Sequence, residues 1–195
     1  MKDNFVHKDI FVGTSGYYFN DWAKNFYPRG LKRDLWLRYY TNFFNSLELN
    51  TTFYAIPDVR RMEEMAKKLP EEFNLHIKLP GAITHRRDVS TTEICSIMKN
   101  FSDAISPLVE KGIVAGYLAQ FPVSFKLNDE NLSSLLHIIK ISPEPLFVEF
   151  RNKNWLDEKI IDIFRENNVG WVIPDAPQIH NLMPDEIVAT SDIGY

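Results

Sequence analysis

The chain has 195 residues, of which 45% are hydrophobic, 13% aromatic and 25% charged, and its formal net charge is −4 at pH 7. This composition excludes a disordered chain, and no apolar run approaches the ~18 residues of a membrane span. A generic nucleic-acid-binding protein is strongly basic, so the acidic balance counts against that class. With a single cysteine, Cys95, and no signal peptide pattern, we expect a cytoplasmic protein without a membrane partner.

Six apolar runs recur along the chain, and each ends in a polar or charged side chain. They are Ile10–Ser15, Ser46–Thr52, Leu75–Leu79, Ile113–Gln120, Leu146–Arg151 and Gly170–Asp175. Continuous apolar runs are typical of parallel strands that are buried on both faces. In parallel α/β proteins the ligand sites lie at the carboxyl ends of the strands. The pattern therefore predicts a parallel sheet with a polar site at one of its ends.

Helix-like segments separate most of these runs. They are Leu31–Phe44, Val59–Leu69, Ser90–Glu110, Glu130–Ile139 and Asp157–Asn167. Asp58 is a suitable N-cap for the second segment, and Pro107 is expected to break or kink the third. Alternating strands and helices indicate repeated βα units, and no linker-like stretch divides the chain. We expect one domain over residues 1–195.

Polar residues two positions apart at the strand ends favour a closed barrel over an open doubly wound sheet. Such residues share one strand face, and inside a barrel they converge at the mouth. The pairs are Glu48 and Asn50, His76 and Lys78, and Glu149 and Arg151. The loop at 13–16 (GTSG) matches neither the G-x-G-x-x-G pattern nor a P-loop, as a nucleotide-binding open sheet would require. The predicted fold is an α/β, TIM-barrel-like (β/α) barrel.

A complete barrel of this kind takes ~250 residues, and here a seventh strand only begins at residues 189–195. We expect an incomplete or open barrel, either abbreviated or part of a longer protein. The end strands of an open barrel expose unpaired backbone groups and an apolar flank. A seam, or a second copy of the chain covering it, is the expected result.

Six ordered segments resemble the YecE-like family, a domain of unknown function. They are GTSGYYFNDWAKNFYPRGL, FNSLELNTTFYAIP, FNLHIKLPGAITHRR, LAQFPVSF, VEFRNKNW and the stretch that begins Asp175-Ala-Pro. The resemblance covers essentially the whole chain and implies a TIM-barrel-like fold. It also implies a missing C-terminal part, since family members continue into a final strand with a V-R-x-H-G pattern. No reaction is carried over from the family.

Candidate catalytic side chains gather at the ends of the predicted strands. They are Glu48, Lys78, His85, Glu149, Arg151 and Asp175. Three carboxylates facing two cations can supply a general acid, a general base and an anion clamp. The alternative is an internal ion-pair network, with Glu149 paired to Arg151 or Glu48 to Lys78, because buried charges need partners.

Other residues at the same end are candidates for ligand binding. They are Thr14, Ser15, Gly16, Tyr17, Trp22, Asn50, Gln120 and Trp155. The aromatic loop after the first strand is either a stacking wall for a base or sugar ring or a hydrophobic plug over the rim. Within it, Tyr17 and Trp22 are expected to be exposed. Trp155 is expected to help close the pocket.

The predicted ligand is small and anionic or polyhydroxylated, and the predicted activity is hydrolysis of a phosphoester in a nucleic-acid or sugar-phosphate substrate. A nuclease-like version requires Lys78 and Arg151 to join Arg86 and Arg87 on one electropositive face. The alternatives are a glycosidase that uses Glu48 and Glu149, and a binding or scaffold module without catalysis. No cofactor is predicted. A divalent metal is the less favoured hypothesis, because the nearby cations would repel it and no HExxH-type spacing exists.

Overall fold

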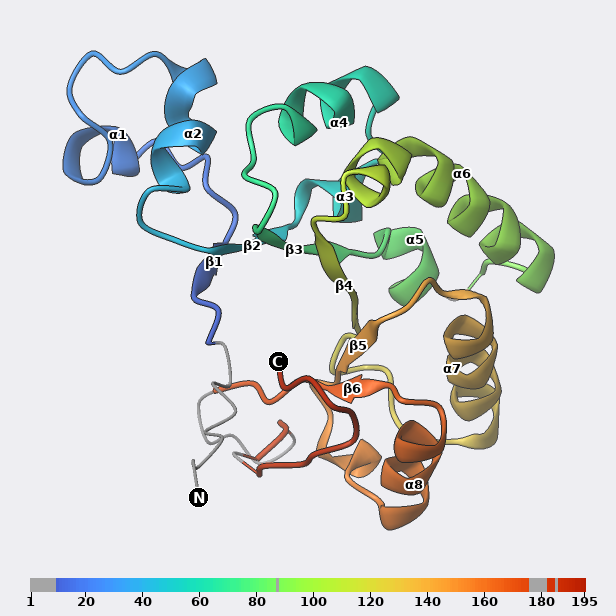
Figure 1. Cartoon of the computed structure of the whole chain (residues 1–195). Coiled ribbons are helices and arrows are strands. Elements are labelled where there is room, and N and C mark those ends of the chain that lie inside the picture. The colour runs from blue at the N-terminus through green and yellow to red at the C-terminus, as the bar shows by residue number, and fades with distance from the viewer. Residues whose placement is uncertain (1–9, 87, 176–181, 185) are drawn as a thin grey trace, which may run out of the picture.

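The computed structural model of the chain describes residues 10–195 except 87, 176–181 and 185. Within these residues six parallel strands form one sheet in the order β1-β2-β3-β4-β5-β6. The strands are β1 Gly13–Ser15, β2 Ser46–Leu49, β3 Asn74–Lys78, β4 Val114–Gln120, β5 Leu146–Glu149 and β6 Gly170–Trp171. The sheet curves, and the helices lie along its outer side (Figure 1). The predicted barrel-like α/β fold is confirmed, with β1 and β6 as the end strands of the described sheet.

The helices occupy the segments between the strands. They are α1 Trp22–Asn25, η1 Arg33–Leu35, α2 Trp36–Tyr40, α3 Thr51–Tyr54, α4 Val59–Ala66, α5 Gly81–Thr84, α6 Thr91–Glu110, α7 Asp129–Ile141, η2 Lys153–Trp155 and α8 Glu158–Glu166. Five of them begin after a residue whose side chain accepts a hydrogen bond from a backbone N–H of the first turn: Asp58, Ser90, Asn128, Asn152 and Asp157. These caps satisfy donors that a helix start leaves unpaired.

Helix α6 continues through Pro107 to Glu110, so the expected break does not occur. Proline removes one backbone donor from the helix. Ile105 and Leu108, which flank Pro107 in the sequence, are both buried in the core. Their packing holds the last turns of the helix in place. No helix within the described residues is long and apolar enough to cross a membrane.

The last part of the chain runs beside β6 without forming the expected seventh strand. The Ile173 N–H donates to the Tyr195 carbonyl at 3.1 Å. The Thr190 hydroxyl accepts from the Trp171 N–H at 2.9 Å and donates to the Val169 carbonyl at 2.6 Å. A side chain therefore occupies a position where a neighbouring strand would place its backbone, and β6 itself ends at Trp171 instead of reaching Asp175.

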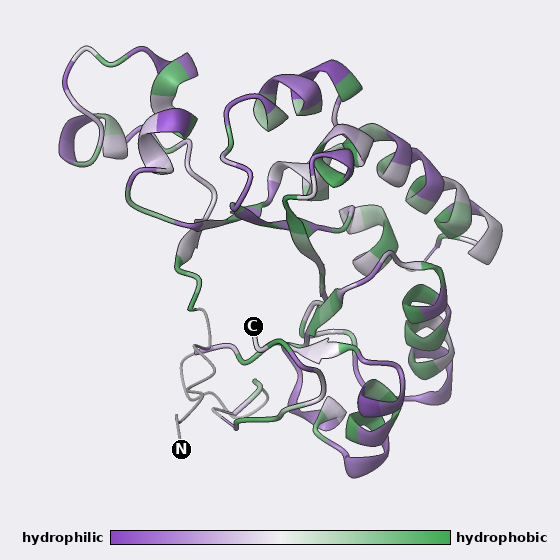
Figure 2. Cartoon of the chain, in the orientation of Figure 1, coloured by the Kyte–Doolittle hydropathy of each residue, from purple (hydrophilic) through white to green (hydrophobic). Residues whose placement is uncertain are grey.

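Alternate residues of each strand face two different environments, as the pleat requires. One set packs outward against the helices in the main core, which includes Leu47, Ile77 and Val148. The other set lies on the inner face, where Leu118, Phe147 and Val172 pack together with Tyr195. In Figure 2, β4 and β5 are mostly hydrophobic, whereas hydrophilic residues recur on the outer helices.

Two glycines of the inner face make room for the ring of Phe147. A Cβ atom at Gly116 on β4, or at Gly170 on β6, would lie 2.3 Å from an atom of that ring. Phe147 therefore fills the inner face across three neighbouring strands. On the other side of the sheet's opening, the residues that precede β1 are uncovered: Ile10, Phe11 and Val12 are 79%, 47% and 56% exposed.

Candidate functional site

Polar side chains from five neighbouring strands line the carboxyl end of the inner face, and we call this group the polar arc. Its members are Ser15 of β1, Glu48 of β2, Lys78 of β3, Gln120 of β4, and Glu149 with Arg151 at the end of β5. The strand register explains why they meet, since Ser15 is paired with Glu48 and Gln120 with Glu149. The sheet order then carries the arc from one end strand to the fifth strand.

At one end of the polar arc, Glu48 accepts hydrogen bonds on both carboxylate oxygens. The Ser15 hydroxyl donates to Oε1 at 2.9 Å, and the Tyr195 hydroxyl donates to Oε2 at 2.6 Å. Asn50 donates its side-chain N–H to Ser15 Oγ. Burial, and then the negative charge of Glu48, raise the pKa of Tyr195, so its hydroxyl stays protonated and remains a donor.

Lys78 is half-buried, and its hydrogen-bond acceptor is a neutral amide. Its ammonium donates to Gln120 Oε1 and lies 5.0 Å from the centre of the Phe53 ring. Burial lowers the pKa of Lys78, and the charges of Glu48 and Glu149 oppose that shift. The direct Glu48–Lys78 pair considered from the sequence is not formed, because each group has another partner.

At the far end of the polar arc, Glu149 accepts from Gln120 Nε2 at 3.3 Å and forms an ion pair with Nε of Arg151. The predicted contact between Glu149 and Arg151 is confirmed. Glu149 is buried, whereas the Arg151 side chain is 42% exposed. A continuous chain of contacts therefore leads from Lys78 through Gln120 and Glu149 to a solvent-facing guanidinium.

His76 lies two residues before Lys78 on the same face of β3, and it is only 8% exposed. Its ring centre is 4.6 Å from that of Tyr195 and 5.4 Å from that of Phe147. Its Nδ1 is buried and has no hydrogen-bond partner in the described structure. Burial lowers the pKa of His76 to about 4, against the opposing charge of Glu48, so the imidazole is neutral at pH 7.

A cavity of about 770 Å³ opens beside the polar arc on the inner face. Its wall includes Thr14, Ser15, Glu48, His76 and Tyr195. Two of these, Ser15 and Glu48, also belong to the polar arc, so the cavity borders the arc at its β1–β2 end and extends from there to the first residues of β1, β2 and β3.

Three other predicted residues lie around the first strand or beyond the last one. Thr14 donates its backbone N–H to the hydroxyl of Tyr40 at 2.9 Å and lines the cavity. Gly16 follows β1 with φ +98°, a conformation that glycine adopts without strain, and it turns the chain away from the sheet. Asp175 is exposed and follows β6 by four residues; no described contact links it to the polar arc.

His85 follows α5 and is exposed. Its Nδ1 lies 2.8 Å from the Thr84 hydroxyl, and its ring centre is 4.8 Å from that of Phe53. The Phe53 ring also lies 5.0 Å from the Lys78 ammonium, so one ring contacts both His85 and a member of the polar arc.

Trp155 lies in the outer core and does not help to close the pocket, which corrects the prediction made from the sequence. It is fully buried, it stacks 4.6 Å from Phe150 and 5.0 Å from Phe125, and its indole N–H donates to the Phe125 carbonyl at 2.6 Å. The large apolar ring gains more from burial against Phe125 and Phe150 than it could at a solvated mouth.

The aromatic loop after β1 is largely packed against itself. Tyr17 and Trp22 are partly buried, whereas Tyr18 and Phe19 are 50% and 42% exposed, so the expected exposure is reversed. Tyr17 accepts on its carbonyl the hydrogen bond of a buried tyrosine hydroxyl, and Trp22 packs 5.2 Å from Phe26. These contacts favour the interpretation of a hydrophobic plug.

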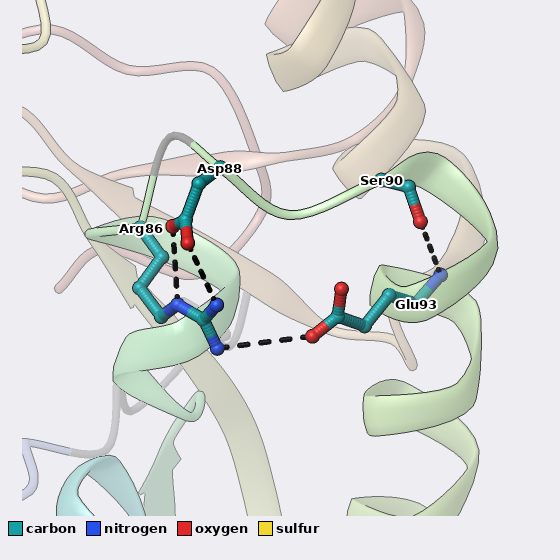
Figure 3. A network of polar contacts seen from close by, with 4 residues as sticks. All are labelled: Arg86, Asp88, Ser90 and Glu93. Atoms are coloured by element: carbon teal, nitrogen blue, oxygen red, sulfur yellow. Dashed lines mark hydrogen bonds and ion pairs between the residues drawn. The ribbon is translucent and has the colours of Figure 1, made fainter.

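Arg86 is paired locally, which weighs against the nuclease-like version with an electropositive face. Figure 3 shows its guanidinium between Asp88, at 3.0 Å, and Glu93, at 3.7 Å, at the start of α6. Ser90 caps the same helix start by accepting from the Glu93 N–H at 3.2 Å. Arg87, the other arginine of that hypothesis, lies outside the described residues.

Two side chains of the site were not identified from the sequence as site residues. His76 carried a usable signal, because it shares a strand face with Lys78. Tyr195 carried none, since no local pattern relates it to Glu48. Among the described residues, no three His, Cys, Asp or Glu side chains are grouped as metal ligands would be.

The curved parallel sheet with a polar site at its carboxyl ends defines a barrel-like α/β protein. A family model described as protein of unknown function DUF72 matches residues 11–195, and the chain belongs to that family. It is similar to a DUF72 family crystal structure from Thermotoga maritima MSB8, at 36% identity and a TM-score of 0.84, over 95% of this chain and 72% of that one. A second, from Enterococcus faecalis V583, is 25% identical with a TM-score of 0.81, over 93% of this chain and 66% of that one.

Two curated relatives are UPF0759 proteins. The chain is 27% identical to YunF of Bacillus subtilis (strain 168), over 94% of this chain and 67% of that protein. It is 24% identical to YecE of Escherichia coli (strain K12), over 76% of this chain and 55% of that protein. The chain thus spans between about half and two thirds of the length of these relatives.

Proposed function

We propose that the polar arc binds the phosphate group of a small anionic or polyhydroxylated ligand and that the chain hydrolyses a phosphoester bond there. The observation that carries this proposal is that two cations, Lys78 and Arg151, reach one polar arc and are held apart by Gln120 and Glu149. Cations fixed in this way can bind an oxyanion without reorganising.

Each cation has donors left for a ligand. A lysine ammonium carries three N–H donors, and Gln120 accepts from Lys78 in the described structure. Arg151 contacts Glu149 through Nε, so the four N–H donors of its two terminal nitrogens take no part in that ion pair. A phosphate between the two side chains would receive charge-assisted hydrogen bonds from both.

The polar arc also contains groups for proton transfer. In the proposed reaction a water oxygen attacks phosphorus while the bond from phosphorus to the leaving alcohol breaks. Glu48 takes the water proton, because each of its oxygens keeps a second lone pair beside its present hydrogen bond. Lys78 gives a proton to the leaving oxygen, a role that a lowered lysine pKa favours.

The pairing within the polar arc supports a second candidate, a binding module without catalysis. Lys78 already donates to Gln120, and Arg151 is already paired with Glu149. A module of this kind would bind phosphate and show no turnover. The glycosidase alternative, with Glu48 and Glu149, would show turnover of nitrophenyl glycosides instead.

The test is titration calorimetry of the full chain with inorganic phosphate, together with hydrolysis of p-nitrophenyl phosphate and bis(p-nitrophenyl) phosphate. Both assays are run in EDTA and again with added Mg²⁺ or Mn²⁺. Lys78→Gln and Arg151→Gln are expected to weaken phosphate binding at least about tenfold, since each removes a charged hydrogen-bond donor. Lys99→Gln and Arg165→Gln, on the exposed faces of α6 and α8, are the matched controls. Equal phosphate binding by all four variants, or none by the unaltered chain, would contradict the proposal.

A further inference from the structure

The cavity beside the polar arc differs from the arc in charge. Its titratable wall residues in the described structure are Glu48, His76, Asp192 and Tyr195, and no lysine or arginine is among them. His76 and Tyr195 are both neutral at pH 7, because burial lowers the pKa of the first and raises that of the second. The remaining charges are carboxylates, so this space repels an anionic group, which the cations of the polar arc would attract.

The wall of the cavity is suited to a ring. The ring centres of His76 and Tyr195, which both line the cavity, are 4.6 Å apart, and the ring centre of Phe147 lies 5.4 and 5.3 Å from theirs. Aromatic faces of this kind bind flat heterocycles and the apolar faces of sugars. The volume of about 770 Å³ falls within the range of about 300–1,000 Å³ that ligand pockets occupy.

One buried group in this wall lacks a partner. His76 is 8% exposed, and its Nδ1 makes no hydrogen bond in the described structure. A buried polar atom without a partner costs about 1–3 kcal/mol, and a ligand with a complementary group would remove that cost. On the same wall Glu48 keeps lone pairs that can accept from a ligand hydroxyl or amine.

We propose that this cavity binds an uncharged ring that carries hydrogen-bond donors, and that the ring belongs to the same ligand whose phosphate lies on the polar arc. The inference rests on the proposed function and specifies its substrate class: a phosphate ester of a ring-bearing alcohol. Glu48, shared by the cavity and the arc, faces the junction between the ring and the phosphate.

The test titrates the full chain with neutral and phosphorylated probes. Adenosine represents a heterocycle, methyl β-D-glucopyranoside represents a sugar, and adenosine 5′-monophosphate and glucose 6-phosphate are their phosphorylated counterparts. We expect one neutral probe to bind, and its phosphorylated counterpart to bind at least about tenfold more tightly because it adds charged hydrogen bonds. Which neutral probe binds tells a heterocycle site from a sugar site.

Variants separate the two halves of the site. His76→Phe keeps a ring and removes the nitrogens, and it should weaken the neutral probe about tenfold while phosphate binding is retained. Lys78→Gln should weaken phosphate binding and retain binding of the neutral probe. His137→Phe on α7 is the matched control for loss of an imidazole. Because His76→Phe alters a buried site, the ¹⁵N shifts of the His76 imidazole in the unaltered chain give a second measurement, and they should move when the neutral probe is added.

The outcomes are distinguishable. If phosphate binds but neither neutral probe does, or if the neutral probe binds equally to His76→Phe and leaves the His76 shifts unchanged, the ring site is overturned and the proposed function stands. If a neutral probe binds in a His76-dependent way and phosphate does not bind, the proposed function is overturned and the cavity assignment is supported.

Discussion

Tyr195 donates its phenolic hydrogen to Oε2 of Glu48 at 2.6 Å, across 147 positions of the sequence. The bond joins the segment that runs beside β6 to strand β2, which lies near the other end of the sheet. It also places the Tyr195 ring against His76 and Phe147 on the inner face. One side chain therefore connects the two flanks of the candidate site.

Tyr195→Phe removes this donor and keeps the ring. We expect a loss of about 1.5–3 kcal/mol in the free energy of unfolding, the range for a hydrogen bond to a charged group. Urea denaturation at pH 7 measures it. Tyr54→Phe, at a position that is 84% exposed, is the control and should change stability by less than about 0.5 kcal/mol. Equal effects of the two variants would show that the Tyr195 hydroxyl contributes nothing to the fold.

His76 should make stability fall in mild acid. Its pKa is about 4 in the folded chain against an ordinary value of 6.5 for histidine, so the unfolded state binds the proton more readily. The contribution of neutral His76 is therefore fully present above about pH 6.5 and is lost as the pH falls toward 4. Between pH 7 and 4.5 this amounts to about 2 kcal/mol.

The measurement is urea denaturation across that pH range, and His76→Phe should show a flatter profile by this amount. An NMR titration of the imidazole gives an independent check. A His76 resonance that titrates near pH 6.5 in the folded chain would contradict the prediction.

Trp155→Phe should destabilise the fold without changing ligand binding. The substitution removes the indole N–H that donates to the Phe125 carbonyl and shrinks a fully buried ring, and we expect a cost of about 1–3 kcal/mol. Phosphate affinity should stay within about twofold of the unaltered chain, a difference of ~0.4 kcal/mol, because Trp155 lies in the outer core. Thermal denaturation and calorimetry together check this. If Trp155→Phe left stability unchanged and abolished phosphate binding, Trp155 would belong to the binding site after all.

Ser90→Ala should cost about 1 kcal/mol, since it removes the side chain that caps α6. Thr92→Ala, an exposed position in the first turn of the same helix, is the control and should lie within about 0.5 kcal/mol of the unaltered chain. Urea denaturation of the two variants side by side gives the difference. If Thr92→Ala is as destabilising as Ser90→Ala, the cap is not the cause.

Features that depend on local periodicity could be predicted from the sequence. Alternation along a strand is a two-residue pattern, so the shared face of Glu149 and Arg151 and their contact followed from spacing alone. The cap at Asp58 was likewise visible as a residue type placed before an apolar-periodic segment.

Features that depend on distant contacts could not be predicted. From the sequence Glu48 was a candidate partner of Lys78, but the Lys78 ammonium donates to Gln120, which lies on the neighbouring strand β4. The position of Trp155 after a strand end gave no indication of which face its ring would take. Packing against Phe150 and Phe125 decided that, and those contacts exist only in the folded chain.

The ring of Phe147 packs directly against the backbones of Gly116 and Gly170. A side chain added at either glycine would collide with the ring, and a smaller residue at 147 would leave a void between the strands. None of the three positions can therefore change size alone without a penalty. During evolution, we expect a change of size at one of these three positions to be accompanied by a compensating change at another. The three residues, although they belong to three separate strands, should therefore covary.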